Sequence, residues 1–232
     1  MDASAYAFVQ GIRSTREALT AWNRHPWRVL RWWLAGSLAA ALVLLAAVWV
    51  IGQLAYGPDW VSLDVPPFVT GGPDDVLGIL EHNLLVLALH AMACVAGFIA
   101  GSSLPMQADG HRGVVRAIHE HGGRIAIAFV AGATIFSLSA QALVLGTSVA
   151  HVSYDIHTTP GLLLVALLPH AIPELMALFL PLAAWIIASR RGEWDQLLAA
   201  TVVTVAVALP VLIVTALWEV YMAPHVLRAV LG

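Results

Sequence analysis

The chain has 232 residues, of which 60% are hydrophobic and only 11% are charged. Soluble domains carry about 25% charged residues, so this composition excludes an ordinary water-exposed globular protein and predicts an all-α, polytopic membrane bundle. The formal net charge of −3 carries little information by itself, and no nucleic-acid partner is expected.

Residues 1–28 are predicted to form a cytoplasmic interfacial segment. Apolar and small side chains recur there at helical spacing, at Phe8, Ile12, Thr15, Leu19 and Trp22, with arginines on the other faces. This pattern predicts an amphipathic helix on the inner leaflet of the membrane. It either anchors and orients the chain or docks a soluble partner.

Residues 29–232 are predicted to form the membrane domain. A helix that crosses the hydrocarbon core needs about 20 apolar residues. Five runs meet this length, at residues 29–53, 84–104, 125–150, 161–188 and 197–221. Cys94 is the single cysteine, so an intrachain disulfide is excluded. Because it lies within the second apolar run, we expect it to serve as a small packing residue.

The arginines predict the direction of the crossings. Ten of the 11 basic residues fall before or at the start of the first run, in the loop 105–124 or in the loop 189–196, and only Arg228 falls on the other side. The positive-inside rule therefore predicts an N-in, C-out chain. All 11 basic residues are arginine, which suggests a GC-rich bacterial genome, so the membrane is expected to be a bacterial cytoplasmic membrane. On the outside, Pro73, Asp74 and Asp75 form a predicted helix start, since carboxylates favour the positive end of the helix dipole.

Small residues mark a packing surface on the second span. Ala93, Gly97 and Gly101 repeat every four residues, and such a stripe lets helix backbones approach closely. Packing within the chain and a homodimer seam are both consistent with it.

Ionisable residues inside the spans form the candidate site. His170 and Glu174 lie four residues apart on one face of the fourth span, while Glu219 lies in the fifth span and His90 in the second. A charge near the bilayer centre costs about 2.5–3.5 kcal/mol on insertion scales. We therefore expect these four side chains to face the bundle interior as one polar cluster.

Prolines accompany this cluster. Pro169, Pro173 and Pro181 lie in the fourth span and Pro210 lies in the fifth, and each removes an amide donor and is expected to kink its helix. Kinked helices at membrane depth are tolerated where they line a cavity or pack against protein.

Three interpretations of the cluster stay open: a structural hydrogen-bonded network, a pathway for a substrate, ion or proton, and a metal site. His170 and Glu174 supply only two ligands, whereas zinc requires three or four, so no metal or cofactor is predicted. The sequence also lacks the motifs of nucleophilic, metallohydrolase and nucleotide-binding enzymes, and no catalytic residues are predicted.

The C-terminal third carries a family resemblance. His170-Ala-Ile-Pro-Glu174-Leu, followed by Ala216-Leu-Trp-Glu219-Val-Tyr-Met-Ala-Pro224, resembles the stage II sporulation protein M family, with its His-Gly-x-x-Glu-Leu and Ala-x-x-Glu elements. The span that opens at Asn83 is similar to the family's Asn-led span. The resemblance covers about residues 80–224, and Ala171 departs from it where the family has glycine.

The resemblance implies a non-enzymatic membrane component that assembles with or localises partner proteins. In spore formers the family protein resembles a scaffold, a membrane component that localises cell-wall hydrolases. The architecture also resembles that of permeases that pair with a separate ATPase, so a transport subunit is the first alternative and an intramembrane metal-dependent enzyme is the second. His170, Glu174 and Glu219 match the family's polar positions, whereas His90 does not.

Overall fold

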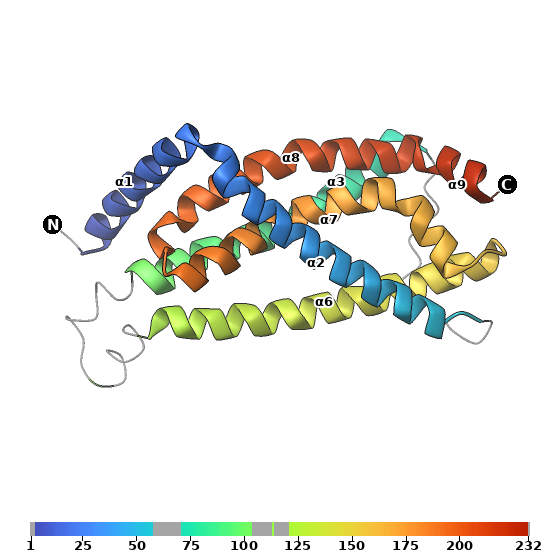
Figure 1. Ribbon diagram of the computed structural model, residues 1–232, viewed down its shortest axis with the longest axis horizontal. Coiled ribbons are helices and arrows are strands. Elements are labelled where there is room, and N and C mark those ends of the chain that lie inside the picture. Colours follow the sequence, from blue (N-terminus) through green and yellow to red (C-terminus); the bar gives the residue numbers. More distant parts are fainter. Residues whose placement is uncertain (1–2, 58–70, 104–112, 114–120, 232) are drawn as a thin grey trace. The chain divides into compact units, whose positions relative to one another are not determined.

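The computed structural model describes residues 3–57, 71–103, 113 and 121–231. Those residues form helices and connecting turns, and strands are absent from this part of the chain. The long helices are α2 (Pro26–Leu54), α3 (Pro73–Phe98), α6 (Gly122–Asp155), α7 (Pro160–Arg191) and α8 (Leu197–Tyr221). Five helices in the described residues are long and apolar enough to cross a membrane, which confirms the predicted all-α class (Figure 1).

The helix ends follow local sequence signals. Proline stands at the first position of α2, α3 and α7, where its missing amide hydrogen costs no helical hydrogen bond. At the start of α3, Asp75 Oδ2 accepts hydrogen bonds from the backbone nitrogens of Gly71 and Gly72, over 2.9 Å and 3.2 Å. Gly192 ends α7 in the left-handed region at φ +72°, which glycine adopts without strain. The predicted helix start at Pro73 is therefore confirmed.

Shorter helices flank the long ones. Helix α1 (Ala3–Arg24) precedes α2, and the chain turns between them at His25, where Pro26 disfavours continued helix (Figure 1). A π-helical turn, η1 (Ile99–Ser103), continues α3, and a 3₁₀ turn, η3 (Trp194–Gln196), precedes α8. The C-terminal helix α9 (Ala223–Leu231) was not among the predicted elements. Most of the loop 105–124 lies outside the described residues.

The chain divides into two compact units, and each of the five long helices contributes one segment to each unit. Unit 1 comprises residues 1–37, 85–133 and 178–208, and unit 2 comprises residues 38–84, 134–177 and 209–232. The predicted boundary at residue 28 divides the chain at one point in the sequence, whereas each of these units combines segments from distant parts of the sequence.

Unit 1 is built around tryptophan and small residues. Its core joins Trp33, Leu180, Ala184 and Ala200, and Trp22 packs edge-to-face on Trp33 with ring centroids 5.2 Å apart. A Cβ added at Gly36 would lie 3.1 Å from the Cβ of Ala183. Glycine and alanine thus let α2 and α7 approach closely, as expected where lipid offers no hydrophobic drive for helix association.

The small-residue stripe of α3 packs inside unit 1. A Cβ at Gly97 would lie 2.6 Å from Trp185 Nε1 and 2.8 Å from Leu197 Cδ1, and a Cβ at Gly101 would overlap the Trp194 ring. Cys94 is fully buried nearby, where its Sγ donates to the Pro181 carbonyl over 3.3 Å. Two of the three stripe residues, Gly97 and Gly101, therefore face indole rings of the same chain, and Ala93 is half-buried.

Unit 2 repeats this use of glycine with different partners. A Cβ at Gly146 of α6 would lie 2.6 Å from Ile51 Cβ, and one at Gly52 of α2 would lie 3.3 Å from Pro160 Cβ. These contacts bring segments of α2, α6 and α7 together, and the same unit holds the polar residues of the candidate site.

Candidate functional site

The fourth predicted span, now α7, places His170 and Glu174 one helical turn apart in unit 2. His170 is only 6% exposed, and its Nδ1 has no hydrogen-bond partner among the described residues. Glu174 is half-buried. The imidazole is thus held in the protein with one polar atom unsatisfied, which is uncommon because a buried polar atom normally finds a partner.

Glu174 is bonded to a residue from another helix. Asn83 of α3 is 5% exposed, and its Nδ2 donates to Glu174 Oε1 over 2.8 Å. Asn83 entered the sequence interpretation only as the residue that opens a span. Nothing in its spacing predicts this contact, because 91 residues separate it from Glu174.

Glu219 of α8 completes the cluster. Its half-buried carboxyl group lies close enough to that of Glu174 for the two charges to interact. Among the described residues of unit 2, Arg228 is the only arginine. Its Nε donates to the Pro224 carbonyl over 3.1 Å and not to either carboxyl group. Within the described residues, neither carboxyl group forms an ion pair. We call Asn83, Glu174 and Glu219 the carboxyl–amide cluster.

A cavity of about 320 Å³ lies between the segments of α7 and α8 in unit 2, and its lining includes Pro173 and Trp218, the residues that precede Glu174 and Glu219 in the sequence. Its lining combines prolines and apolar side chains with two polar groups: Pro169, His170, Pro173, Pro210, Val211, Val214, Thr215 and Trp218. Three of the four prolines predicted to kink helices therefore meet around one space. Both α7 and α8 are continuous helices through their prolines, and the predicted kinks stay predictions.

The remaining proline and histidine of the predicted site belong to unit 1. Pro181 is buried there and accepts the thiol of Cys94. His90 packs edge-on against Phe179, with ring centroids 5.6 Å apart, and its Nδ1 has no hydrogen-bond partner among the described residues. His90 thus has its own surroundings in unit 1, whereas His170, Glu174 and Glu219 share unit 2.

Other polar candidates are satisfied locally. Gln141 Nε2 donates to Ser137 Oγ over 3.3 Å within α6. His151 Nε2 lies 3.4 Å from Asp155 Oδ2 on the same helix. Among the residues that the structure describes, no three histidine, cysteine, aspartate or glutamate side chains form a group that could hold a metal ion.

The arrangement can bind a proton or a cation. Two carboxyl groups close enough to interact in a medium of low dielectric repel when both are ionised, and a proton or bound cation relieves that repulsion. Asn83 keeps one oxygen of Glu174 hydrogen-bonded in either state. The unsatisfied imidazole of His170 lies one turn away and lines the cavity.

No protein-family profile, curated protein or solved structure gives a significant match to this chain. The resemblance to the stage II sporulation protein M family therefore depends on the motifs quoted above.

Proposed function

We propose that this protein is a non-enzymatic integral component of a bacterial cytoplasmic membrane that assembles with or localises partner proteins, as the resemblance to the stage II sporulation protein M family implies. One observation supports this proposal above others. The resemblance uses elements from three separate spans, and the polar residues of those elements, Asn83, Glu174 and Glu219, form one cluster.

The position of Asn83 is the informative part of this cluster. Ionisable residues inside the spans are expected to gather whatever the family, whereas Asn83 is singled out by the family resemblance and bonds to Glu174 across 91 residues of sequence. A buried polar network also costs free energy unless its members are paired, so each member requires the others. The proximity of residues from the three motifs is consistent with a shared family architecture and supports the proposal.

The test is affinity purification of the tagged full-length chain from its native host in mild detergent, followed by mass spectrometry of the proteins that co-purify. A stoichiometric partner is expected. A cell-wall hydrolase would identify a scaffold, and an ATPase would identify a permease subunit. A chain that purifies alone under several detergents, or that hydrolyses a peptide, lipid or glycan by itself, would overturn the proposal.

Two variants show whether the carboxyl–amide cluster serves the assembly. Glu174→Gln removes the ionisable carboxyl group but retains a side-chain oxygen that can accept from Asn83, so the fold is expected to survive. Asp155→Asn, at an exposed carboxylate on α6, is the matched control. Loss of the partner in Glu174→Gln but not in Asp155→Asn would connect the cluster to the assembly.

A second function, transport, is favoured by two interacting carboxyl groups, Glu174 and Glu219, whose preceding residues line a cavity. If Glu174 and Glu219 carry protons or cations, the purified protein in liposomes will dissipate a proton gradient or accumulate a cation without a partner. Glu174→Gln and Glu219→Gln would each abolish this flux, and Asp155→Asn would leave it unchanged. Liposomes that are no more permeable than protein-free ones would exclude autonomous proton or cation transport.

A further inference from the structure

Helix α1 forms one wall of an apolar groove in unit 1. The groove has a volume of about 800 Å³, within the range of about 300–1,000 Å³ typical of small-molecule sites. Its lining is mainly apolar and includes Ile12, Leu19, Val29, Leu30 and Phe98. Trp22 and Trp33, which pack edge-to-face, also line it.

A basic pocket adjoins this groove on α1. The pocket has a volume of about 490 Å³ and is lined by Arg13, Arg16, Glu17, Thr20, Ala21 and Arg24. Arg16 and Thr20 line both spaces, so the apolar groove and the basic pocket meet at these two residues.

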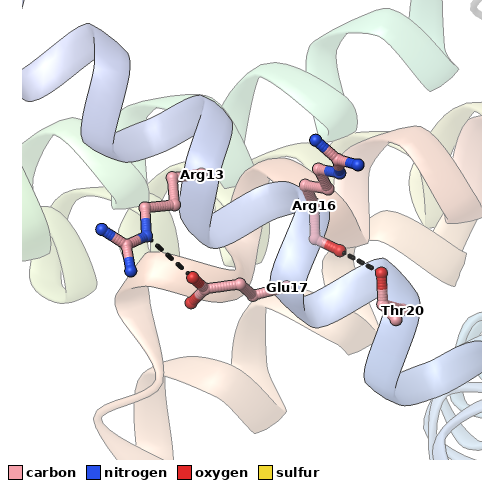
Figure 2. A network of polar contacts seen from close by, with 4 residues as sticks. All are labelled: Arg13, Arg16, Glu17 and Thr20. Atoms are coloured by element: carbon pink, nitrogen blue, oxygen red, sulfur yellow. Dashed lines mark hydrogen bonds and ion pairs between the residues drawn. The ribbon is translucent and has the colours of Figure 1, made fainter.

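The charges in the basic pocket leave Arg16 available. Arg13 Nε donates to Glu17 Oε1 over 2.9 Å, so the carboxylate of the pocket is already paired (Figure 2). The Arg16 side chain extends away from Glu17 and has no partner among the described residues, while the Arg16 backbone carbonyl accepts a hydrogen bond from the Thr20 hydroxyl over 2.8 Å (Figure 2). Three arginines against one glutamate make the pocket net positive.

We propose that α1 and the start of α2 bind one anionic phospholipid, with an acyl chain in the apolar groove and the headgroup phosphate on Arg16. The occupant must join an apolar tail to an anionic group, because the apolar groove and the basic pocket share residues. A guanidinium pairs with phosphate through two parallel hydrogen bonds, and the exposed Arg24 adds positive charge beside it. This charge complementarity favours phosphatidylglycerol or cardiolipin over a zwitterionic lipid.

The experiment is native mass spectrometry of the full-length, delipidated protein in detergent, titrated with phosphatidylglycerol or with phosphatidylcholine of the same acyl chains. The wild type is expected to retain phosphatidylglycerol about fivefold more tightly, the effect of about one basic residue near an anionic lipid. Arg16→Gln is expected to bind both lipids alike. Arg28→Gln, at an exposed arginine that lines neither space, should keep the wild-type preference.

A second variant tests the apolar half of the site. Val29→Phe enlarges a half-buried side chain that lines the groove and should weaken both lipids without removing the preference between them. Equal binding of both lipids by the wild type, or an unchanged preference in Arg16→Gln, would overturn the proposal. Thermal unfolding of each variant in the same detergent verifies that it is folded.

Discussion

Asn83 on α3 donates its side-chain amide to Glu174 on α7 over 2.8 Å, across 91 residues of sequence. Both residues belong to unit 2, and Asn83 is 5% exposed. This bond connects the span that opens at Asn83 to the helix that carries the His170-x-x-x-Glu174 element. It also leaves the second carboxyl group, that of Glu219, to interact with Glu174 by charge alone.

Replacing Asn83 by leucine should destabilise the protein, because Glu174 Oε1 loses its amide donor while it stays half-buried. We expect the free energy of unfolding to fall by about 1–3 kcal/mol, the cost of leaving a buried acceptor unsatisfied. Unfolding by sodium dodecyl sulfate in mixed micelles measures this change. His82→Leu, at the exposed neighbouring residue, should cost less, and equal stabilities of the two variants would contradict the role of this hydrogen bond.

The two carboxyl groups of the cluster should be energetically coupled. Glu174→Gln and Glu219→Gln each remove one of two interacting carboxyl groups, so their effects on stability should be non-additive by about 0.5–3 kcal/mol in a double-mutant cycle. The same unfolding assay at neutral pH measures the coupling. A cycle that pairs Glu219→Gln with Asp155→Asn is the control, because Asp155 is paired with His151. Additive effects of Glu174→Gln and Glu219→Gln would show that the two groups do not interact.

The glycine stripe of α3 gives a prediction about packing within the chain. Gly97→Ala would place a Cβ 2.6 Å from Trp185 Nε1, and Trp185 is 3% exposed, so the ring has little room to move. We expect a loss of about 1–3 kcal/mol, as is typical of overpacked sites. Gly132→Ala on α6 meets no atom within 4 Å in the described residues and should be neutral.

Gly97→Ala also shows whether the glycine stripe packs within one chain or between two chains of a homodimer. If Gly97 packs only inside unit 1, Gly97→Ala lowers stability without changing the molar mass measured by light scattering. A dimer that dissociates in Gly97→Ala, with the monomer as stable as the wild type, would instead support the seam.

The orientation of the chain can be measured with cysteine substitutions in a Cys94→Ser background. The arginine distribution predicts that Ala21→Cys is shielded in spheroplasts and that Ala229→Cys reacts with a membrane-impermeant maleimide. Both positions are exposed on the protein. Cys94 in the parent chain is fully buried and should stay unlabelled until the protein is denatured. Labelling of Ala21→Cys before permeabilisation would contradict the predicted topology and place residue 21 outside the cell.

The sequence by itself determined the helices, because their signals are local. An apolar run of sufficient length must satisfy its backbone hydrogen bonds within itself when it crosses a membrane, and this requirement alone predicts the five long helices. Prolines at residues 26, 73 and 160 also act locally, through the missing amide hydrogen, and they mark where helices begin. The short helix α9 was missed, because nine residues are too few for a span.

The tertiary structure decided which polar groups meet. Sequence spacing places His170 and Glu174 on one face of α7, but the rotation and register of each helix against its neighbours decide what that face contacts. Those quantities depend on contacts such as Gly146 against Ile51, which involve residues far apart in the chain. For the same reason, the structure gave Glu174 the partner Asn83 and gave His90 surroundings in unit 1, and neither outcome follows from periodicity within a single helix.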